Sequence, residues 1–78
     1  MVHELKILPE YFEAVQNGNK PFDLRNNDRD YQRGDYLFLR EYWDDRYTGR
    51  EIMKKVTYVL RNAEKYGLKE GYAILGIK

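Results

Sequence analysis

Apolar and polar residues alternate along several stretches of this sequence, a pattern typical of strands that bury one face. The first stretch, 3–8, places His3, Leu5 and Ile7 on the buried side. Further strands are predicted at 20–25, 36–43, 50–61 and 72–77. Large apolar groups lie on both faces of the third strand, which should be central, and the nearly continuous apolar run of the last should be buried on both faces. The length of the fourth strand indicates a bend or a bulge.

One helix is predicted between the first two strands. Pro9 suits the first helical position, where the missing N–H costs nothing. Tyr11, Phe12 and Val15 then form an apolar stripe at helical spacing. Gly18 is a plausible stop, because glycine adopts the left-handed C-terminal conformation easily. The sequence therefore predicts a short helix of about two and a half turns.

Three polar connections separate these elements. Turn-forming residues bracket 26–35, the longest stretch without an apolar rhythm. A hairpin loop is predicted at 44–49, with Gly49 available for a positive φ, and 62–71 should be a surface connection with one helical turn at 63–66. The order of elements predicts a single α+β domain over 1–78. We expect a small β-barrel of five or six mostly antiparallel strands with one helix after the first strand.

Length, charge and cysteine content limit the functions open to this domain. With 78 residues and a formal net charge of +1, the chain presents no strong overall field to a polyanion, so any nucleic-acid site must be a local patch. The absence of cysteine excludes disulfides and thiolate chemistry. No apolar run approaches the roughly 20 residues that cross a bilayer, and the first residues lack a signal-peptide core. We expect a cytoplasmic protein with no membrane partner.

The second predicted strand carries three charged candidates, Lys20, Asp23 and Arg25. Strand alternation places Asp23 and Arg25 on one face and Phe22 on the other. Arg25 can offer a forked donor to a phosphate or base edge while Asp23 accepts from an exocyclic amine. Alternatively, the two residues simply pair with each other on the surface. Alternation also puts Lys20 on the Phe22 face, so a shared site requires the chain to turn near Pro21 or Gly18.

Two further side chains are candidates for proton transfer. His3, the only histidine, is either a hydrogen-bonded core residue or a general base. Glu41 shares a face with Leu37 and Leu39, and it either points into a cleft as an acid or base or marks the point where its strand emerges into water.

No metal or other cofactor is predicted. A lone histidine without cysteine makes a zinc site unfavourable. Asp28, Asp30 and Asp35 lack the spacing and terminal glutamate of a calcium loop.

Arginines and tyrosines are mixed through the middle of the chain, a combination that binds single-stranded nucleic acid by phosphate attraction and base stacking. The residues concerned are Arg29, Arg33, Arg40, Arg46 and Arg50, with Tyr31, Tyr36, Tyr42 and Tyr47. Interleaved aspartates weaken this patch, and each tyrosine can equally serve sheet packing. We take Arg29, Tyr31 and Arg40 as candidate ligand contacts beside the charged strand.

The chain resembles the ASCH domains, small members of the PUA-like superfamily, in the run GNKPFDLR at 18–25, the Gly34-Asp35 pair that opens the next strand, and the terminal strand GYAILGI. It is similar over nearly its whole length to one ASCH-related family of unknown function in bacteria and phages, in the opening HELKILPEYFEAV and the block NNDRDYQRGDYLFLREY. The resemblance implies a PUA-type barrel of five or six strands, with the helix over one end and a cleft beside it.

ASCH domains are generally proposed to bind RNA, and a few similar bacterial members hydrolyse the amide of acylated cytidine with a lysine, a threonine and a glutamate. Lys20 matches that lysine and Arg25 the arginine that ends the same strand. Asp23 takes the place of the threonine, and the second half of the chain is too short to match the glutamate. The sequence therefore favours an RNA- or nucleotide-binding module. Hydrolysis of a modified nucleobase by Lys20, Asp23 and Glu41 is the alternative, and a protein-interaction domain is a third possibility.

Overall fold

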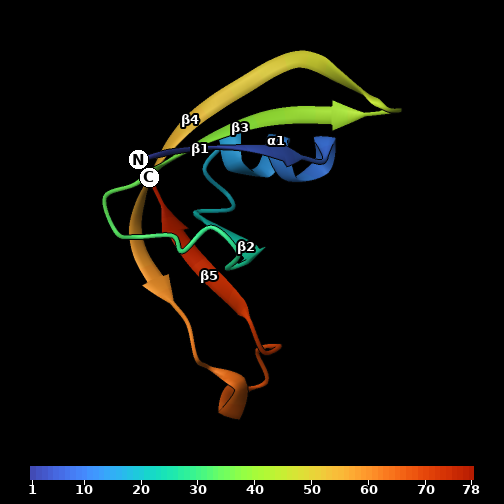
Figure 1. Cartoon of the computed structure of the whole chain (residues 1–78). Coiled ribbons are helices and arrows are strands. Elements are labelled where there is room, and N and C mark those ends of the chain that lie inside the picture. The colour runs from blue at the N-terminus through green and yellow to red at the C-terminus, as the bar shows by residue number, and fades with distance from the viewer.

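Five strands form one curved, mixed sheet, and a single α-helix lies against its inner face in the computed structural model, which describes all of residues 1–78 (Figure 1). The elements in chain order are β1 (Val2–Ile7), α1 (Pro9–Gln16), β2 (Phe22–Asn26), β3 (Tyr36–Trp43), β4 (Arg46–Leu60), the 3-10 helix η1 (Glu64–Tyr66) and β5 (Tyr72–Ile77). The predicted α+β class, with one helix after the first strand, is confirmed. None of the helices has the length and apolar character that a membrane-spanning helix needs.

The order of strands in the sheet is β1-β3-β4-β5-β2, so β1 and β2 form its two edges. β1 pairs with β3 in parallel, and the other pairs are antiparallel. β3 is flanked on both sides, which confirms its predicted central position. The long strand β4 pairs first with β3 and then with β5, and its bend carries the sheet from one half to the other (Figure 1).

The helix begins and ends where the sequence predicts. Pro9 is its first residue, and the N–H of Asn17 closes it by donating to the carbonyl of Glu13 at 3.0 Å. Phe12 and Val15 are buried in the core, as the apolar stripe indicates, whereas Tyr11 remains largely exposed.

The hairpin between β3 and β4 is tighter than predicted. Instead of a loop over 44–49, the turn consists of Asp44 and Asp45, whose φ values of 55° and 59° suit a two-residue turn that matches the twist of the strands. Gly49 does adopt a positive φ of 98°, but it lies inside β4, where the register with β3 shifts. This bulge explains the glycine but lies outside the predicted strand 50–61. The bend or bulge predicted within that strand is confirmed by a second register shift, with β5, between Val56 and Tyr58.

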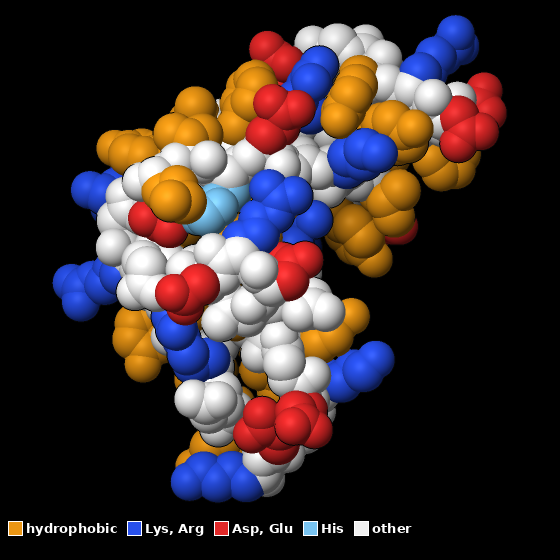
Figure 2. All heavy atoms as spheres, viewed as in Figure 1, with side chains coloured by type: hydrophobic (Ala, Val, Ile, Leu, Met, Phe, Trp, Pro, Cys, Tyr) orange, Lys and Arg blue, Asp and Glu red, His pale blue; other side chains and the backbone are white.

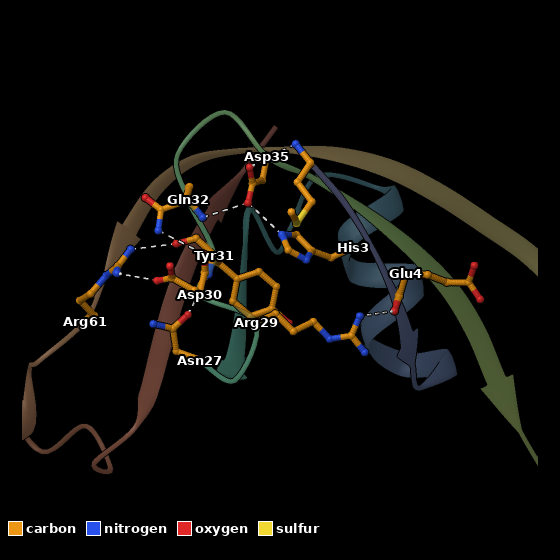
Figure 3. A network of polar contacts seen from close by, with 10 residues as sticks. His3, Glu4, Asn27, Arg29, Asp30, Tyr31, Gln32, Asp35 and Arg61 are labelled. Carbon is orange, nitrogen blue, oxygen red and sulfur yellow. Dashed lines mark hydrogen bonds and ion pairs between the residues drawn. The ribbon is translucent and has the colours of Figure 1, made fainter.

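The connection 26–35 is polar, as predicted, but two of its residues, Tyr31 and Asp35, are buried. Tyr31 is only 1% exposed and is the largest fully buried side chain in the molecule. The carboxamide of Asn27 accepts a hydrogen bond from the Tyr31 N–H at 3.0 Å, and the His3 ring meets the Tyr31 ring edge-on at 4.7 Å (Figure 3). The loop 26–35 therefore contributes the Tyr31 ring to the core, although most of its other residues are exposed.

β5 is buried on one face only, contrary to the prediction of burial on both. Ala73, Leu75 and Ile77 lie in the core, but Tyr72 and Ile74 are half-buried on the outer side. The explanation is that no second layer covers the outer face of this half of the sheet, because the only α-helix lies on the inner side (Figure 1).

Candidate functional site

Hydrogen bonds join three charged side chains, Lys20, Asp23 and Arg25, in one row beside α1. The buried carboxylate of Asp23 accepts from Lys20 Nζ at 3.3 Å through Oδ1 and from Arg25 Nε at 2.7 Å through Oδ2. β2 begins only at Phe22, so strand alternation does not govern Lys20. The Lys20 N–H instead donates to the carbonyl of Ala14 in α1 at 2.9 Å, which supplies the turn that a shared site requires.

The two faces of β2 are separated as predicted, but the charged face is the one that points inward. Asp23 is 5% exposed, whereas Phe22 and Leu24 are 44% and 51% exposed. A buried carboxylate costs several kcal/mol unless it is paired, and here both of its oxygens have cationic partners. The row is therefore an internal ion-pair network, not the loose surface pair of the simpler alternative.

A cleft of about 350 Å³ lies beside the first helix, next to this row. Its lining residues are Tyr11, Lys20, Phe22, Asp23 and Leu24. Lys20 Nζ lies 5.4 Å from the centre of the Tyr11 ring and 4.9 Å from that of Phe22, so the ammonium stands between two largely exposed aromatic rings. The cleft combines one cation, one carboxylate and two stacking surfaces.

Two arginines bridge the open edges of the sheet. Arg25 Nη2 donates to the Lys6 carbonyl at 2.9 Å and Arg29 Nη1 to the Glu4 carbonyl at 3.1 Å, which satisfies carbonyls on the free side of β1. We call this region, where β2 and the loop after it face β1, the seam. Positively charged side chains lie at the centre of this face of the molecule (Figure 2).

The seam contains a smaller cavity of about 200 Å³. It is lined by Leu5, Arg25, Asn26, Asp28, Arg29 and Tyr31. The buried Tyr31 ring has no open face on which a base can stack. Burial raises the pKa of the Tyr31 hydroxyl above its ordinary value, against the opposing charges of Arg29 and Arg25. Asp23 lines the cleft and Arg25 lines this cavity, so their ion pair forms the wall between the two.

Glu41 is buried but lies outside the cleft. Its Oε1 accepts from the Thr48 hydroxyl at 2.6 Å, and its buried Oε2 has no hydrogen bond, with Arg50 Nη1 at 3.7 Å. Arg50 also bonds Glu13 of α1 at 2.7 Å, and this bond raises the pKa of the guanidinium. Glu41 therefore shares no hydrogen-bond or ion-pair partner with Lys20.

His3 is a hydrogen-bonded core residue, which is one of the two alternatives that the sequence left open. Its Nε2 lies 2.8 Å from Asp35 Oδ2, which also accepts the Gln32 N–H at 3.1 Å. The hydrogen bond from His3, assisted by that from Gln32, holds the pKa of Asp35 below its ordinary value despite burial. Sequence reasoning did not assign Asp35 a structural role, and the Gly34-Asp35 pair before β3 was the only available signal. No three His, Asp or Glu side chains gather closely enough to hold a metal ion.

Arg40 lies on the outer face of the sheet, away from the cleft. It contacts Glu4 at 3.1 Å and Glu51 at 3.5 Å, and its guanidinium lies 3.8 Å from the centre of the Tyr47 ring. The predicted ligand contacts are therefore divided, with Arg29 and Tyr31 at the seam and Arg40 on the outer surface.

Comparison with known proteins places the chain in a family. Residues 2–77 match a domain of unknown function, DUF3850. An uncharacterized 12.9 kDa protein in the GpA 3' region of Escherichia phage P2 is 40% identical over 58 residues, which is 74% of this chain and 53% of that protein. The chain therefore spans about half the length of this relative. Since the match extends over almost every residue of the fold described above, the chain belongs to the DUF3850 family.

Proposed function

We propose that this domain binds RNA or a nucleotide in the cleft beside α1. The observation that carries the proposal is the row of Lys20, Asp23 and Arg25, in which a buried carboxylate fixes two cations next to two exposed rings. The likeness to ASCH domains supports it, because RNA binding is the role generally proposed for them. In the same interpretation, the seam between β1 and β2 is where a PUA-like barrel would close.

The row keeps donors free for a ligand. Lys20 Nζ uses two of its three N–H groups, on the Phe22 carbonyl and on Asp23. Arg25 uses Nε and Nη2, which leaves Nη1. A phosphate or a base carbonyl can accept the remaining Lys20 donor while Tyr11 and Phe22 stack on the base, and Arg25 offers its donor to a phosphate at the adjoining cavity of the seam. Because Asp23 already holds both cations in place, little side-chain entropy is lost on binding.

The geometry favours binding over amide hydrolysis. Hydrolysis needs a group beside Lys20 that takes a proton from water or from the nucleophile. Both oxygens of Asp23 already accept hydrogen bonds from cations, and Glu41 accepts from Thr48 outside the cleft. Neither carboxylate is placed for that step, so the amidohydrolase remains the alternative that the experiment below must exclude.

The test is binding of labelled mononucleotides and single-stranded RNA, measured by fluorescence anisotropy at several salt concentrations. Lys20→Gln and Arg25→Gln should each weaken binding about tenfold or more, since each removes a charge-assisted hydrogen bond. Lys65→Gln, which removes one charge from the exposed η1 region, is the matched control and should change little. Equal binding by wild type and the double variant would contradict the proposal. Release of product from N-acylated cytidine would favour the hydrolase.

A further inference from the structure

The outer face of the β1-β3-β4 half of the sheet is a surface of aromatic and charged side chains that no other element covers. Residues paired across neighbouring strands point to the same face, so the register identifies this set. We call it the outer platform: Val2, Glu4 and Lys6 of β1; Tyr36, Phe38, Arg40 and Tyr42 of β3; Tyr47, Glu51, Met53 and Lys55 of β4. α1 lies on the opposite face (Figure 1), and orange side chains alternate with blue and red ones along the upper rim of Figure 2.

Cations lie directly on the rings of the platform. Lys6 Nζ is 4.3 Å from the centre of the Tyr42 ring, and the Arg40 guanidinium is 3.8 Å from that of Tyr47. Tyr42 and Tyr47 meet edge to face at 5.1 Å. Along β3, Tyr36 continues the same face and is 41% exposed. Rings and stacked guanidinium planes are the surfaces on which single-stranded bases stack.

The charge on the platform suits a polyanion. Lys6, Arg40 and Lys55 supply three cations, and the two acids, Glu4 and Glu51, both contact Arg40 and are partly neutralised by it. Lys6 and Lys55 make no ion pair, so their ammonium groups are available to phosphates. The surface therefore offers stacking with a modest electrostatic contribution, which is the combination used by sheet surfaces that bind single strands.

From this arrangement we infer that the outer platform binds single-stranded nucleic acid, as a second contact surface next to the cleft. The platform meets the seam at β1, and the cleft lies beyond the ion pair of Asp23 and Arg25. Lys6 stacks on Tyr42 with its side chain and accepts from Arg25 with its carbonyl, and Glu4 likewise contacts Arg40 on the platform and Arg29 at the seam. A strand of several nucleotides can thus run from the platform across β1 to the cleft. Only the continuation of the strand into the cleft rests on the proposed function.

The other half of the sheet provides the contrast that makes the inference specific. On the outer face of β4, β5 and β2, the paired residues are mostly apolar, and the exposed ones include Tyr58 and Leu60 of β4 and Phe22 and Leu24 at the margin of the cleft. No arginine or lysine is among the paired residues of that face. Lys20 and Lys69 lie at its margins, near the rings of Phe22 and Tyr72. Tyr58 is therefore an exposed strand tyrosine without the charges of the platform, and it serves as the matched control for Tyr36.

The experiment compares three labelled probes: a mononucleotide, a single-stranded RNA of roughly ten nucleotides and DNA of the same sequence. Tyr36→Ala and Tyr47→Ala should each lower the affinity for both strands by about five- to a hundredfold, the range of one lost stacking contact. Binding of the mononucleotide should not change. Tyr58→Ala should leave all three affinities within about twofold of wild type. Thermal unfolding of each variant verifies that it is folded, and Arg40→Lys, which keeps the charge but loses the planar stack, replaces any variant that is not.

Each result decides one point. Weaker binding of the strands by Tyr36→Ala and Tyr47→Ala but not by Tyr58→Ala supports the platform. An equal or larger loss with Tyr58→Ala overturns it, since the strand then lies on the apolar half. Strand affinity no higher than mononucleotide affinity also overturns it and leaves the cleft intact. Failure of the mononucleotide to bind counts against the cleft alone. A preference of RNA over DNA identifies contacts with the 2′-hydroxyl.

Discussion

Asp23 and Asp35 are both buried carboxylates that accept more than one hydrogen bond, yet their surroundings differ. Asp35 accepts hydrogen bonds from the buried His3 ring, from the backbone N–H of Gln32 and, at 3.4 Å, from the N-terminal ammonium of Met1, and its contacts with His3 and Gln32 belong to the network of Figure 3. Asp23 bonds Lys20 and Arg25, whose side chains are 17% and 23% exposed at the cleft and the seam. One carboxylate therefore fastens a loop to the core, and the other holds two cations at the surface.

The two carboxylates differ in whether their partners line a cavity and leave N–H groups unused there. The side chain of His3 is 4% exposed, so this partner has little access to solvent or to a ligand, and the exposed Met1 ammonium lines none of the cavities of the molecule. Lys20 and Arg25 keep unused N–H groups and partial access to solvent. Burial of a charged side chain is thus not by itself a sign of a binding site. A carboxylate that organises a ligand site has partners that line a cleft or cavity and keep donors free, as Lys20 and Arg25 do, whereas the partners of a structural carboxylate line none.

The largest effect should come from Asp35→Ala. Removing the carboxylate leaves the buried His3 ring and the Gln32 N–H without their acceptor, which should lower the free energy of unfolding by about 3 kcal/mol. Urea unfolding followed by circular dichroism measures this loss. The control is Asp30→Asn in the same loop, because the Asp30 side chain is 80% exposed and asparagine tolerates its φ of 49°. Similar losses in both variants would show that Asp35 has no special role.

Asp23→Ala should destabilise the fold less and impair binding more. Lys20 and Arg25 can extend into water when their partner is removed, so we expect the free energy of unfolding to fall by about 1 to 2 kcal/mol. Both cations then lose their fixed positions, and the affinity for a labelled mononucleotide should fall about tenfold. A loss of stability as large as that of Asp35→Ala, with unchanged nucleotide affinity, would make the two aspartates equivalent and remove the basis of the comparison.

The sequence predicted the elements of this fold well where a local rule applied. Alternation identified β1 and β3, and Pro9 with the apolar stripe identified α1. The hairpin at 44–49 was predicted too long, because non-glycine residues with positive φ such as Asp44 and Asp45 carry a weaker signal than Gly49, which instead forms a bulge. Local patterns also do not reveal that β1 pairs in parallel with β3, since that pairing joins segments separated by the helix and β2.

The candidate site was predicted in part. Lys20, Asp23 and Arg25 do form one ion-pair row, with Lys20 and Asp23 at the cleft beside the helix and Arg25 at the adjoining cavity of the seam. Their inward orientation could not be read from alternation, which separates two faces without saying which one is buried. Tyr31 was assigned to ligand binding because arginines and tyrosines are mixed around it, and its place in the core depends on His3, which lies 28 positions earlier. Long-range packing of this kind leaves no local trace in the sequence.

The smallest effect that we expect is a difference in acid sensitivity. Because its hydrogen bonds hold the pKa of Asp35 below the ordinary value in the folded state, ionised Asp35 stabilises the fold above the unfolded pKa. That stabilisation is lost as the pH falls through the folded pKa, and one pKa unit corresponds to about 1.4 kcal/mol. Asp35→Asn, which does not titrate, should therefore have a flatter profile of unfolding free energy between roughly pH 5 and the acid limit of the wild type. Urea unfolding at several pH values tests this, with Asp30→Asn as the control that should keep the wild-type slope. Parallel profiles for Asp35→Asn and the wild type would contradict this prediction.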